Sequence, residues 1–284
     1  YVVHQAKSVG TIDPPATETV AKTFSGATTI SGALVASSTA QFDTIGVGAA
    51  KDLGTGLHIK TADSGASVSV HADELVVEGS ANSGLSILSG ASSNGRIMFG
   101  DSGDNDIGYI EYDHSANQLA LGANAASHLK IDSTGAVTKP LQPAASYRGD
   151  AEANLTGDGT EKTIGVTSGA GVTELWDNNA DLTNGTFTAP VTGKYLITGQ
   201  VFIEDIASNH DNMLVTMQTS NRSYYIALNI STLGRASASS FGFPFCAVAD
   251  MDANDTHVLK LSVSGGSKVI DMVDLFTCQV TLLG

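Results

Sequence analysis

The sequence predicts an all-β protein in two parts, a fibrous β shaft that forms a trimer and a globular β-sandwich head. Apolar residues alternate with polar ones in short runs and do not follow the spacing of a helical stripe. These runs end at Gly, Ser, Asn and Asp, which favour turns. Of the 17 aromatic residues, 6 lie before residue 145 and 11 after it, so only the second half can build a large core alone.

Residues 1–21 form the first segment, which we expect to be an extended lead-in. It contains Asp13-Pro14-Pro15 and few large apolar groups. The sequence starts at Tyr1 and no signal peptide precedes that residue, so we expect the segment to continue from a longer polypeptide.

Residues 22–138 make up the predicted shaft. The motif Gly-Leu-x-Ile occurs at Gly56 and again 28 residues later at Gly84, and Leu-x-Ile returns at Leu129. In such alternating strands the apolar residues share one face, which predicts His58 and His128 on the solvent side. One chain has too few large side chains to offset the entropy of ordering this backbone. Three copies wound about one axis would cover each other's apolar faces, so we expect a homotrimer.

Two prolines, Pro140 and Pro143, lie in the segment 139–144 and predict a short, stiff linker, because proline interrupts strand pairing. Residues 145–284 then form the head, in which β-prone runs are separated by polar turns, as is typical of a sandwich. The predicted strands are Ala145–Arg148, Glu174–Trp176, Thr186–Ala189, Lys194–Glu204, Asn212–Thr219, Ser223–Ile230, Ser240–Ala249, His257–Ser264 and Leu275–Leu283.

One corner of the head carries a distinctive motif, Phe-x-Ala-Pro-x-x-Gly-x-Tyr, from Phe187 to Tyr195. A long alternating strand follows it, then the Phe-rich run Ser240–Ala249 and a terminal strand from Phe276 to Leu283. In this order the motif resembles the globular heads of the complement and tumour-necrosis-factor superfamily. The resemblance covers about Ser146 to Gly284 and implies a compact jelly roll that associates as a tight trimer.

The shaft carries a second resemblance. The run RIMFGDSG, from Arg96 to Gly103, leads to the alternating run Ile107–Tyr112 and then to LKIDSTG, which ends at Gly135. This order is similar to the shafts of tail fibres of tailed phages, upstream of a receptor-binding tip. The likeness spans about residues 22–138 and implies a virion protein that attaches to a host cell.

The acidic composition limits the classes of partner. Residues 1–144 have a net charge of −7 and residues 145–284 a net charge of −8, which sum to the −15 of the chain. Acidic surfaces repel phosphate backbones and anionic lipids, so we expect no nucleic-acid partner. The longest apolar runs are too short to span a bilayer, so we expect no membrane insertion. Cys246 and Cys278 lie in apolar β-prone runs, and we expect buried free thiols rather than a disulfide.

Two acidic turns are candidate calcium sites, because calcium prefers hard oxygen ligands. The alternative at both places is an Asx-rich or solvated turn. The carboxylates concerned are Asp101, Asp104 and Asp106 in the shaft, and Asp250, Asp252 and Asp255 in the head. The histidines are scattered without zinc spacing, and apart from calcium we expect no cofactor.

No catalytic motif is found in the sequence, and we expect no enzyme. A spike that cleaves polysaccharide would use paired carboxylates, for which Asp104, Asp106 and Glu111 are the candidates. The shaft has too few aromatic residues to bind sugar rings beside them.

Two polar segments of the head are candidates for receptor binding, since exposed Tyr, Trp and Arg anchor interfaces and stack on sugars. In a strand, Tyr224 and Tyr225 point to opposite faces, so we expect one of them to be exposed. The candidate residues are Asp205, Asn209, His210, Asp211, Asn221, Arg222, Tyr224, Tyr225 and Trp176.

These observations and resemblances predict the distal part of a viral tail fibre or spike. A trimeric shaft would present three shallow sites to a host-cell receptor, which we expect to be a carbohydrate, and weak contacts would add through avidity. An upstream segment would attach the chain to the virion. Two alternatives remain, a secreted non-viral adhesin or recognition protein with the same head, and a depolymerising tailspike.

Overall fold

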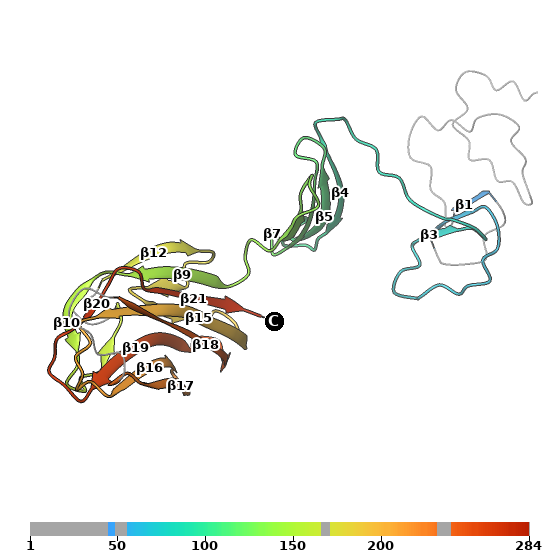
Figure 1. Cartoon of the computed structure of the whole chain (residues 1–284). Helices are drawn as coiled ribbons and strands as arrows, with labels where there is room; N and C mark the ends of the chain where they lie inside the picture. Colours follow the sequence, from blue (N-terminus) through green and yellow to red (C-terminus); the bar gives the residue numbers. More distant parts are fainter. Residues whose placement is uncertain (1–44, 49–55, 166–170, 232–239, 284) are drawn as a thin grey trace, which may run out of the picture. The chain divides into compact units, whose positions relative to one another are not determined.

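The computed structural model describes residues 45–48, 56–165, 171–231 and 240–283, and within these ranges it contains β-strands and no α-helix (Figure 1). The all-β prediction is therefore confirmed. The predicted lead-in, residues 1–21, and residues 22–44 of the predicted shaft lie outside the described residues. Within the described ranges, no helix has the length and apolar character that a membrane crossing needs. The chain divides into two compact units between Ser86 and Ile87.

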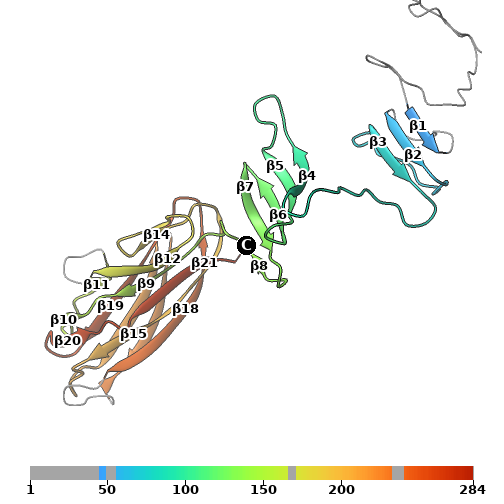
Figure 2. The same ribbon diagram turned by 90° about the horizontal axis from the view of Figure 1, so that it is seen from above.

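The first unit contains a parallel three-stranded sheet in the order β1-β2-β3 (Figure 2). Its strands are β1 (Ile45–Gly48), β2 (Leu57–Lys60) and β3 (Leu75–Glu78). In this register Leu57 pairs with Leu75 and Ile59 with Val77, so the four apolar side chains share one face. Leu75 is 53% exposed and Val77 38% exposed. These two side chains are only partly covered, so β3 presents an apolar face to solvent.

The opposite face of this sheet is buried and polar. His58, Lys60 and Glu78 are at most 6% exposed. The His58 Nε2 atom lies 2.9 Å from Glu78 Oε2, and Lys60 Nζ lies 3.5 Å from the same oxygen. The backbone N–H of Ser64 donates to Glu78 Oε1 at 2.8 Å and, as the largest cause, lowers the pKa of this carboxyl to about 2. The Lys60 ammonium and the Glu78 carboxylate therefore stabilise one another away from solvent.

The predicted solvent position of His58 is wrong. Alternation correctly predicts which residues share a face, but it does not say which face the chain covers. Here the loop around Ser64 covers the polar face through Glu78, and the apolar face is left open. His128, by contrast, is exposed as predicted, and its Nε2 atom lies 3.0 Å from the carbonyl oxygen of Ala123.

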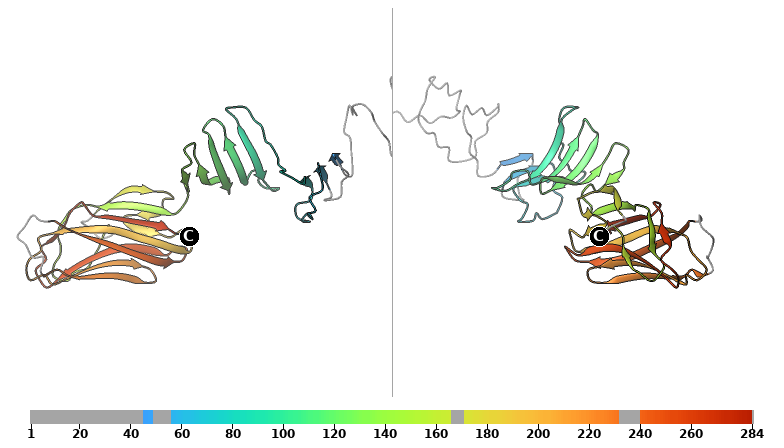
Figure 3. Two further views of the ribbon diagram at one scale, coloured as in Figure 1. Left: turned by 45° about the vertical axis from the view of Figure 1, so that its right-hand side comes forward. Right: turned by 90° about the vertical axis from the view of Figure 1, so that its left-hand side faces the viewer.

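The second unit begins with an antiparallel five-stranded sheet in the order β4-β5-β6-β7-β8 (Figure 3). Its strands are β4 (Asn94–Phe99), β5 (Gly108–Asp113), β6 (Gln118–Ala123), β7 (Ala126–Ile131) and β8 (Val137–Thr138). Short connections join consecutive strands, so the sheet is a simple meander.

One face of this meander is apolar from edge to edge. In the strand register, Ile97 pairs with Ile110, which pairs in turn with Leu121. The side chains on this face that are more than a third exposed are Ile97, Phe99, Ile110, Tyr112, Leu121 and Val137. The other face carries the ion pair between Arg96 and Glu111. A monomer rarely leaves so many apolar groups together in water.

The head is a sandwich of two antiparallel sheets, seen as two layers in Figures 1 and 3. The first head sheet has the order β10-β20-β15-β21-β9-β12, with β18 paired to β15. Its strands are β9 (Ala144–Gly149), β10 (Glu152–Thr156), β12 (Val172–Asp177), β15 (Gly193–Glu204), β18 (Phe241–Met251), β20 (Ile270–Met272) and β21 (Thr277–Leu282).

The second head sheet has the order β13-β14-β19-β16-β17, with β11 paired to β19. Its strands are β11 (Lys162–Thr163), β13 (Leu182–Thr183), β14 (Thr186–Thr188), β16 (Asn212–Thr219), β17 (Ser223–Asn229) and β19 (Thr256–Ser264). The inward side chains of the two sheets form one core. This arrangement is consistent with the predicted jelly-roll sandwich.

The Phe187–Tyr195 motif forms a corner between the two sheets. The Tyr195 hydroxyl donates to the carbonyl oxygen of Val191 at 2.7 Å, and its ring packs edge-on against Phe187 with centroids 5.6 Å apart. Phe187, Ala189 and Tyr195 are fully buried. The apolar members of the motif therefore fix the turn by filling the core beneath it.

The two cysteines are both free, but only Cys278 is buried. Cys246 lies on β18 opposite Thr198, and these two residues share the outward face of the first head sheet. Its neighbours on β18, Phe245 and Ala247, point inward. The prediction of a buried thiol is therefore wrong for Cys246, because an apolar run on an edge strand still sends alternate side chains outward.

Candidate functional site

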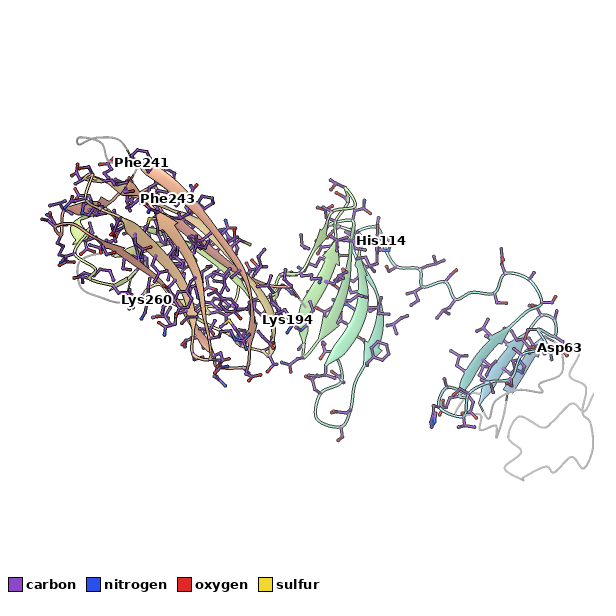
Figure 4. The ribbon with its side chains drawn as sticks, turned by 60° about the horizontal axis from the view of Figure 1, so that its bottom comes forward. Asp63, His114, Lys194, Phe241, Phe243 and Lys260 are labelled. Atoms are coloured by element: carbon purple, nitrogen blue, oxygen red, sulfur yellow. The ribbon has the colours of Figure 1, made fainter. Side chains whose placement is uncertain are left out.

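The two ends of the head are defined by the long antiparallel pair β15–β18. At one end Lys194 pairs with Asp250, and at the other Ile203 pairs with Phe241. Figure 4 shows Lys194 and Phe241 at opposite ends of the head. The linker joins at the Lys194 end, where the N–H of Leu282 donates to the carbonyl oxygen of Pro143 at 2.9 Å. We call these the linker end and the far end.

The predicted receptor-binding residues do not form one site. Asp205, Asn209, His210 and Asp211 lie in the β15–β16 connection at the far end. Asn221 and Arg222 lie in the β16–β17 turn at the linker end. The eight residues of β16 lie between the two groups. At 3.3 Å per residue, this strand separates them by about 25 Å.

His210 is not available to a receptor, and its predicted role is corrected. The residue is 0% exposed. Its Nδ1 atom accepts the N–H of Ala207 at 2.9 Å, so Nε2 carries the proton and faces the carbonyl oxygen of Ser267 at 3.0 Å. A Cβ at Gly266 would lie 2.3 Å from the ring. His210 therefore links two loops at the far end of the head through these hydrogen bonds. The polar sequence of its loop does not predict that the side chain is buried.

The aromatic candidates have different surroundings. Tyr225 is 62% exposed on the edge strand β17, while Tyr224 packs against the core. Trp176 on β12 is 41% exposed and pairs with Ser146 of β9. Tyr225 and Trp176 thus remain available as platforms for a ligand, and Tyr224 has a structural role.

Three loops meet at the linker end, and Asp255 connects them. Its Oδ1 atom accepts the Ser220 hydroxyl at 2.7 Å. Its Oδ2 atom accepts the side-chain amide of Asn221 and the N–H of Asp252, the latter at 2.8 Å. The Thr192 hydroxyl adds the third loop by accepting the N–H of Ala253 at 3.1 Å. The segment that contains Asn221 and the segment that contains Asp252 and Asp255 were predicted as separate sites. These hydrogen bonds hold the two segments together.

A polar cavity of about 170 Å³ lies at this junction, lined by Asn221, Arg222, Asp250 and Asp252. Lys194 pairs with one of these carboxylates, its Nζ atom lying 3.0 Å from Asp250 Oδ1. Lys194 was not among the predicted site residues. Two features of the sequence could have identified Lys194. It directly follows the corner glycine at the start of a strand, and the antiparallel partner strand ends in acidic residues, which places a carboxylate beside it.

The predicted calcium ligands have local roles in the structure. Asp101 Oδ1 accepts the N–H groups of Gly103 and Asp104, which lower its pKa. Asp255 accepts hydrogen bonds at both oxygens, as described above. Within the described ranges, no group of three or more His, Cys, Asp or Glu side chains could hold a metal ion. Calcium binding therefore stays a prediction to which the geometry adds no support.

The carboxylates considered for sugar cleavage are not arranged as a pair. Asp104 Oδ1 accepts the N–H of Asp106 within the β4–β5 turn. Glu111 lies on the polar face of the meander and is ion-paired with Arg96. None of these groups lines the cavity at the linker end.

No protein-family model matches the sequence, and no curated protein matches it either. Solved structures that resemble the chain include the globular domain of zebrafish complement 1qA protein, at 14% identity and a TM-score of 0.34, covering 50% of this chain and 98% of that one. Murine APRIL is 10% identical over 49% of this chain and 99% of that one, with a TM-score of 0.32. The PRD1 vertex protein P5 is 11% identical over 56% of this chain and 84% of that one, with a TM-score of 0.37. At these scores the similarities carry no argument about function.

Proposed function

We propose that this chain is the distal part of a viral tail fibre or spike, which attaches a phage virion to a carbohydrate on the host-cell surface as a homotrimer. The observation that carries the proposal is the pair of thin sheets that each leave an apolar face open. The first sheet exposes Leu75 and Val77, and the meander exposes a face that includes Phe99, which is 56% exposed.

Three copies of the chain offer the simplest cover for these faces. An apolar surface buried against an identical one is stabilised by roughly 25 cal/mol for each Å² removed from water. The buried polar face at Glu78 supports the same arrangement. Its ionisable groups have partners within the chain, so the face that remains open for a second copy is the apolar one. A rod built in this way ends in three heads.

The heads are proposed to bind the host. Each exposes aromatic side chains at Tyr225 and Trp176 and has a polar cavity at the linker end. Three weak sites on one rod act together, because the second and third contacts form at a high effective concentration. We propose binding without cleavage, since the sequence contains no catalytic motif and the carboxylates considered for cleavage, Asp104 and Glu111, have local partners in the meander.

Two measurements test this function. Light scattering on the full chain should give three times 29.0 kDa, and a monomer would contradict the shaft argument. Fluorescently labelled chain should adsorb to a subset of strains in a bacterial panel, and periodate oxidation of the cell-surface glycans should abolish adsorption. Adsorption that resists periodate, or binding only to animal cells, would contradict a phage fibre that recognises carbohydrate. Release of reducing ends from capsular polysaccharide would instead indicate a depolymerase.

A further inference from the structure

We propose that the cavity at the linker end of the head binds a neutral sugar residue through Arg222, Asp252, Asp250 and Asn221. This inference rests on the proposed attachment function and makes it specific, because it names the subsite and the charge class of the glycan. The four side chains come from two connections, the β16–β17 turn and the end of β18 with the turn that follows it.

The charges around the cavity select against ions. Asp250 and Asp252 line it, and the Asp255 carboxylate accepts the N–H of Asp252, so an anionic ligand would be repelled. Arg222 lines the same cavity and Lys194 pairs with Asp250, so these two cations offset most of the negative charge. Within the described residues no group of three or more His, Cys, Asp or Glu side chains could hold a metal ion, so a neutral ligand suits the cavity best.

The hydrogen-bonding groups suit a ligand that both donates and accepts. The Asn221 amide N–H₂ donates to Asp255, which leaves its carbonyl oxygen directed elsewhere as an acceptor. Asp252 accepts the Thr192 hydroxyl weakly at 3.5 Å through Oδ1. Arg222 supplies donors in a planar fork. Adjacent hydroxyl groups of a sugar ring can donate to the carboxylates and accept from the guanidinium at the same time.

The cavity is also held in place before a ligand arrives. Asp255 fixes Asn221 and the backbone of Asp252, and the N–H of Asn254 donates to the carbonyl oxygen of Ala189 at 2.7 Å. Asn254 itself has a φ of 73°, in the left-handed region that Asn tolerates. A volume of about 170 Å³ is of the order of one monosaccharide, so the cavity is a subsite for a single sugar unit.

The test uses the full chain on a glycan array printed with neutral hexose- and N-acetylhexosamine-terminated oligosaccharides and with their sialylated and sulfated counterparts. Wild type should bind a neutral set, and titration calorimetry with the best array sugar should give a measurable affinity. Arg222→Gln and Asp252→Asn should each weaken that affinity about tenfold or more, because each removes a charge-assisted hydrogen bond. Lys268→Gln and Asp274→Asn make the same charge changes outside the cavity and should leave the affinity unchanged.

Three results would overturn the proposal: binding confined to acidic glycans, no glycan binding at all, or neutral binding that Arg222→Gln and Asp252→Asn leave intact. The thermal midpoint of each variant establishes that a loss of binding is not unfolding. If the array is negative while the chain still adsorbs to cells in a periodate-sensitive way, the cavity is not the subsite and the attachment function stands. If the chain adsorbs to no cell yet binds a neutral sugar through Arg222, the attachment function fails and the subsite stands.

Discussion

The Nε2 atom of His257 lies 3.9 Å from the Sγ atom of Cys278 in the interior of the head. Both residues are fully buried. Burial lowers the pKa of His257 to about 4 and raises the pKa of Cys278 to about 12. A neutral imidazole beside a neutral thiol is not an activated nucleophile, because the thiolate is the reactive form. The pair belongs to the core and affects stability rather than chemistry.

His257 should make the head less stable in acid. Its ordinary pKa is 6.5, so the unfolded chain takes up a proton below that pH, while the folded head resists protonation down to about pH 4. The unfolding free energy is therefore highest above pH 6.5 and should fall by about 3 kcal/mol between pH 6.5 and 4. Urea titrations followed by Trp176 fluorescence measure this change.

The matched variants for this prediction are His257→Gln and His128→Gln. The first removes the buried imidazole and should flatten the fall in stability between pH 6.5 and 4. The second removes an exposed imidazole and should leave the pH dependence as it is. Equal slopes in all three proteins would show that His257 is not responsible.

Gly199 should not tolerate a side chain. A Cβ at this position, in the middle of β15, would lie 2.0 Å from the backbone oxygen of Thr277 and 2.6 Å from the Phe245 ring. Gly199→Ala should therefore destabilise the head by about 3 kcal/mol, measured by urea denaturation. At Gly84 a Cβ would meet nothing within 4 Å, so Gly84→Ala serves as the control and should have a small effect.

The apolar face of the meander should be needed for assembly. Leu121 is 40% exposed on that face, and Leu121→Gln would place a polar amide where a second copy is proposed to pack. Light scattering on a dilution series should show the variant dissociating at concentrations where wild type keeps its mass. Lys130→Gln, on the polar face, should not change the mass. An intact oligomer in both variants would argue against this face as the contact.

His210 should contribute to stability and not to adhesion. His210→Ala removes two hydrogen bonds and leaves a buried N–H and carbonyl without partners, at a cost of about 2 kcal/mol. The thermal midpoint of the head should fall, while glycan binding below that temperature should match wild type. Asn209→Ala, at the exposed neighbour, should leave the midpoint unchanged. A selective loss of binding in His210→Ala would restore the role that the sequence suggested.

The long strands of the head could be predicted from sequence, because alternation over eight or more residues is a strong signal. Asn212–Thr219 has the predicted bounds, and Lys194–Glu204 differs from β15 by one residue. One strand of five residues, Glu152–Thr156, was not predicted. The other head strands that were not predicted, such as Lys162–Thr163 and Ile270–Met272, have two or three residues. Runs this short carry no periodicity, and only the neighbouring strands define them.

The candidate site was harder to predict, because the relevant distances depend on the path of the chain. The sequence marked the polar segments around His210 and Arg222 as two candidates for receptor binding, and the predicted strand between them implies opposite ends of the head. It also treated Asn221 and Asp255 as parts of different sites, and they are hydrogen-bonded to each other. Contacts between loops that are 34 residues apart follow from sheet order, which local patterns do not encode.

The open apolar side at Leu75 and Val77 has a consequence for biosynthesis. If further copies of the chain cover this side, as proposed above, a newly made chain completes the region only after it meets them, so the yield of native rods should depend on how often chains meet while they are still on or near the ribosome. At low expression, proteases would trim the front of the molecule and leave the head behind. The proportion of full-length to trimmed product should therefore rise with the rate of synthesis.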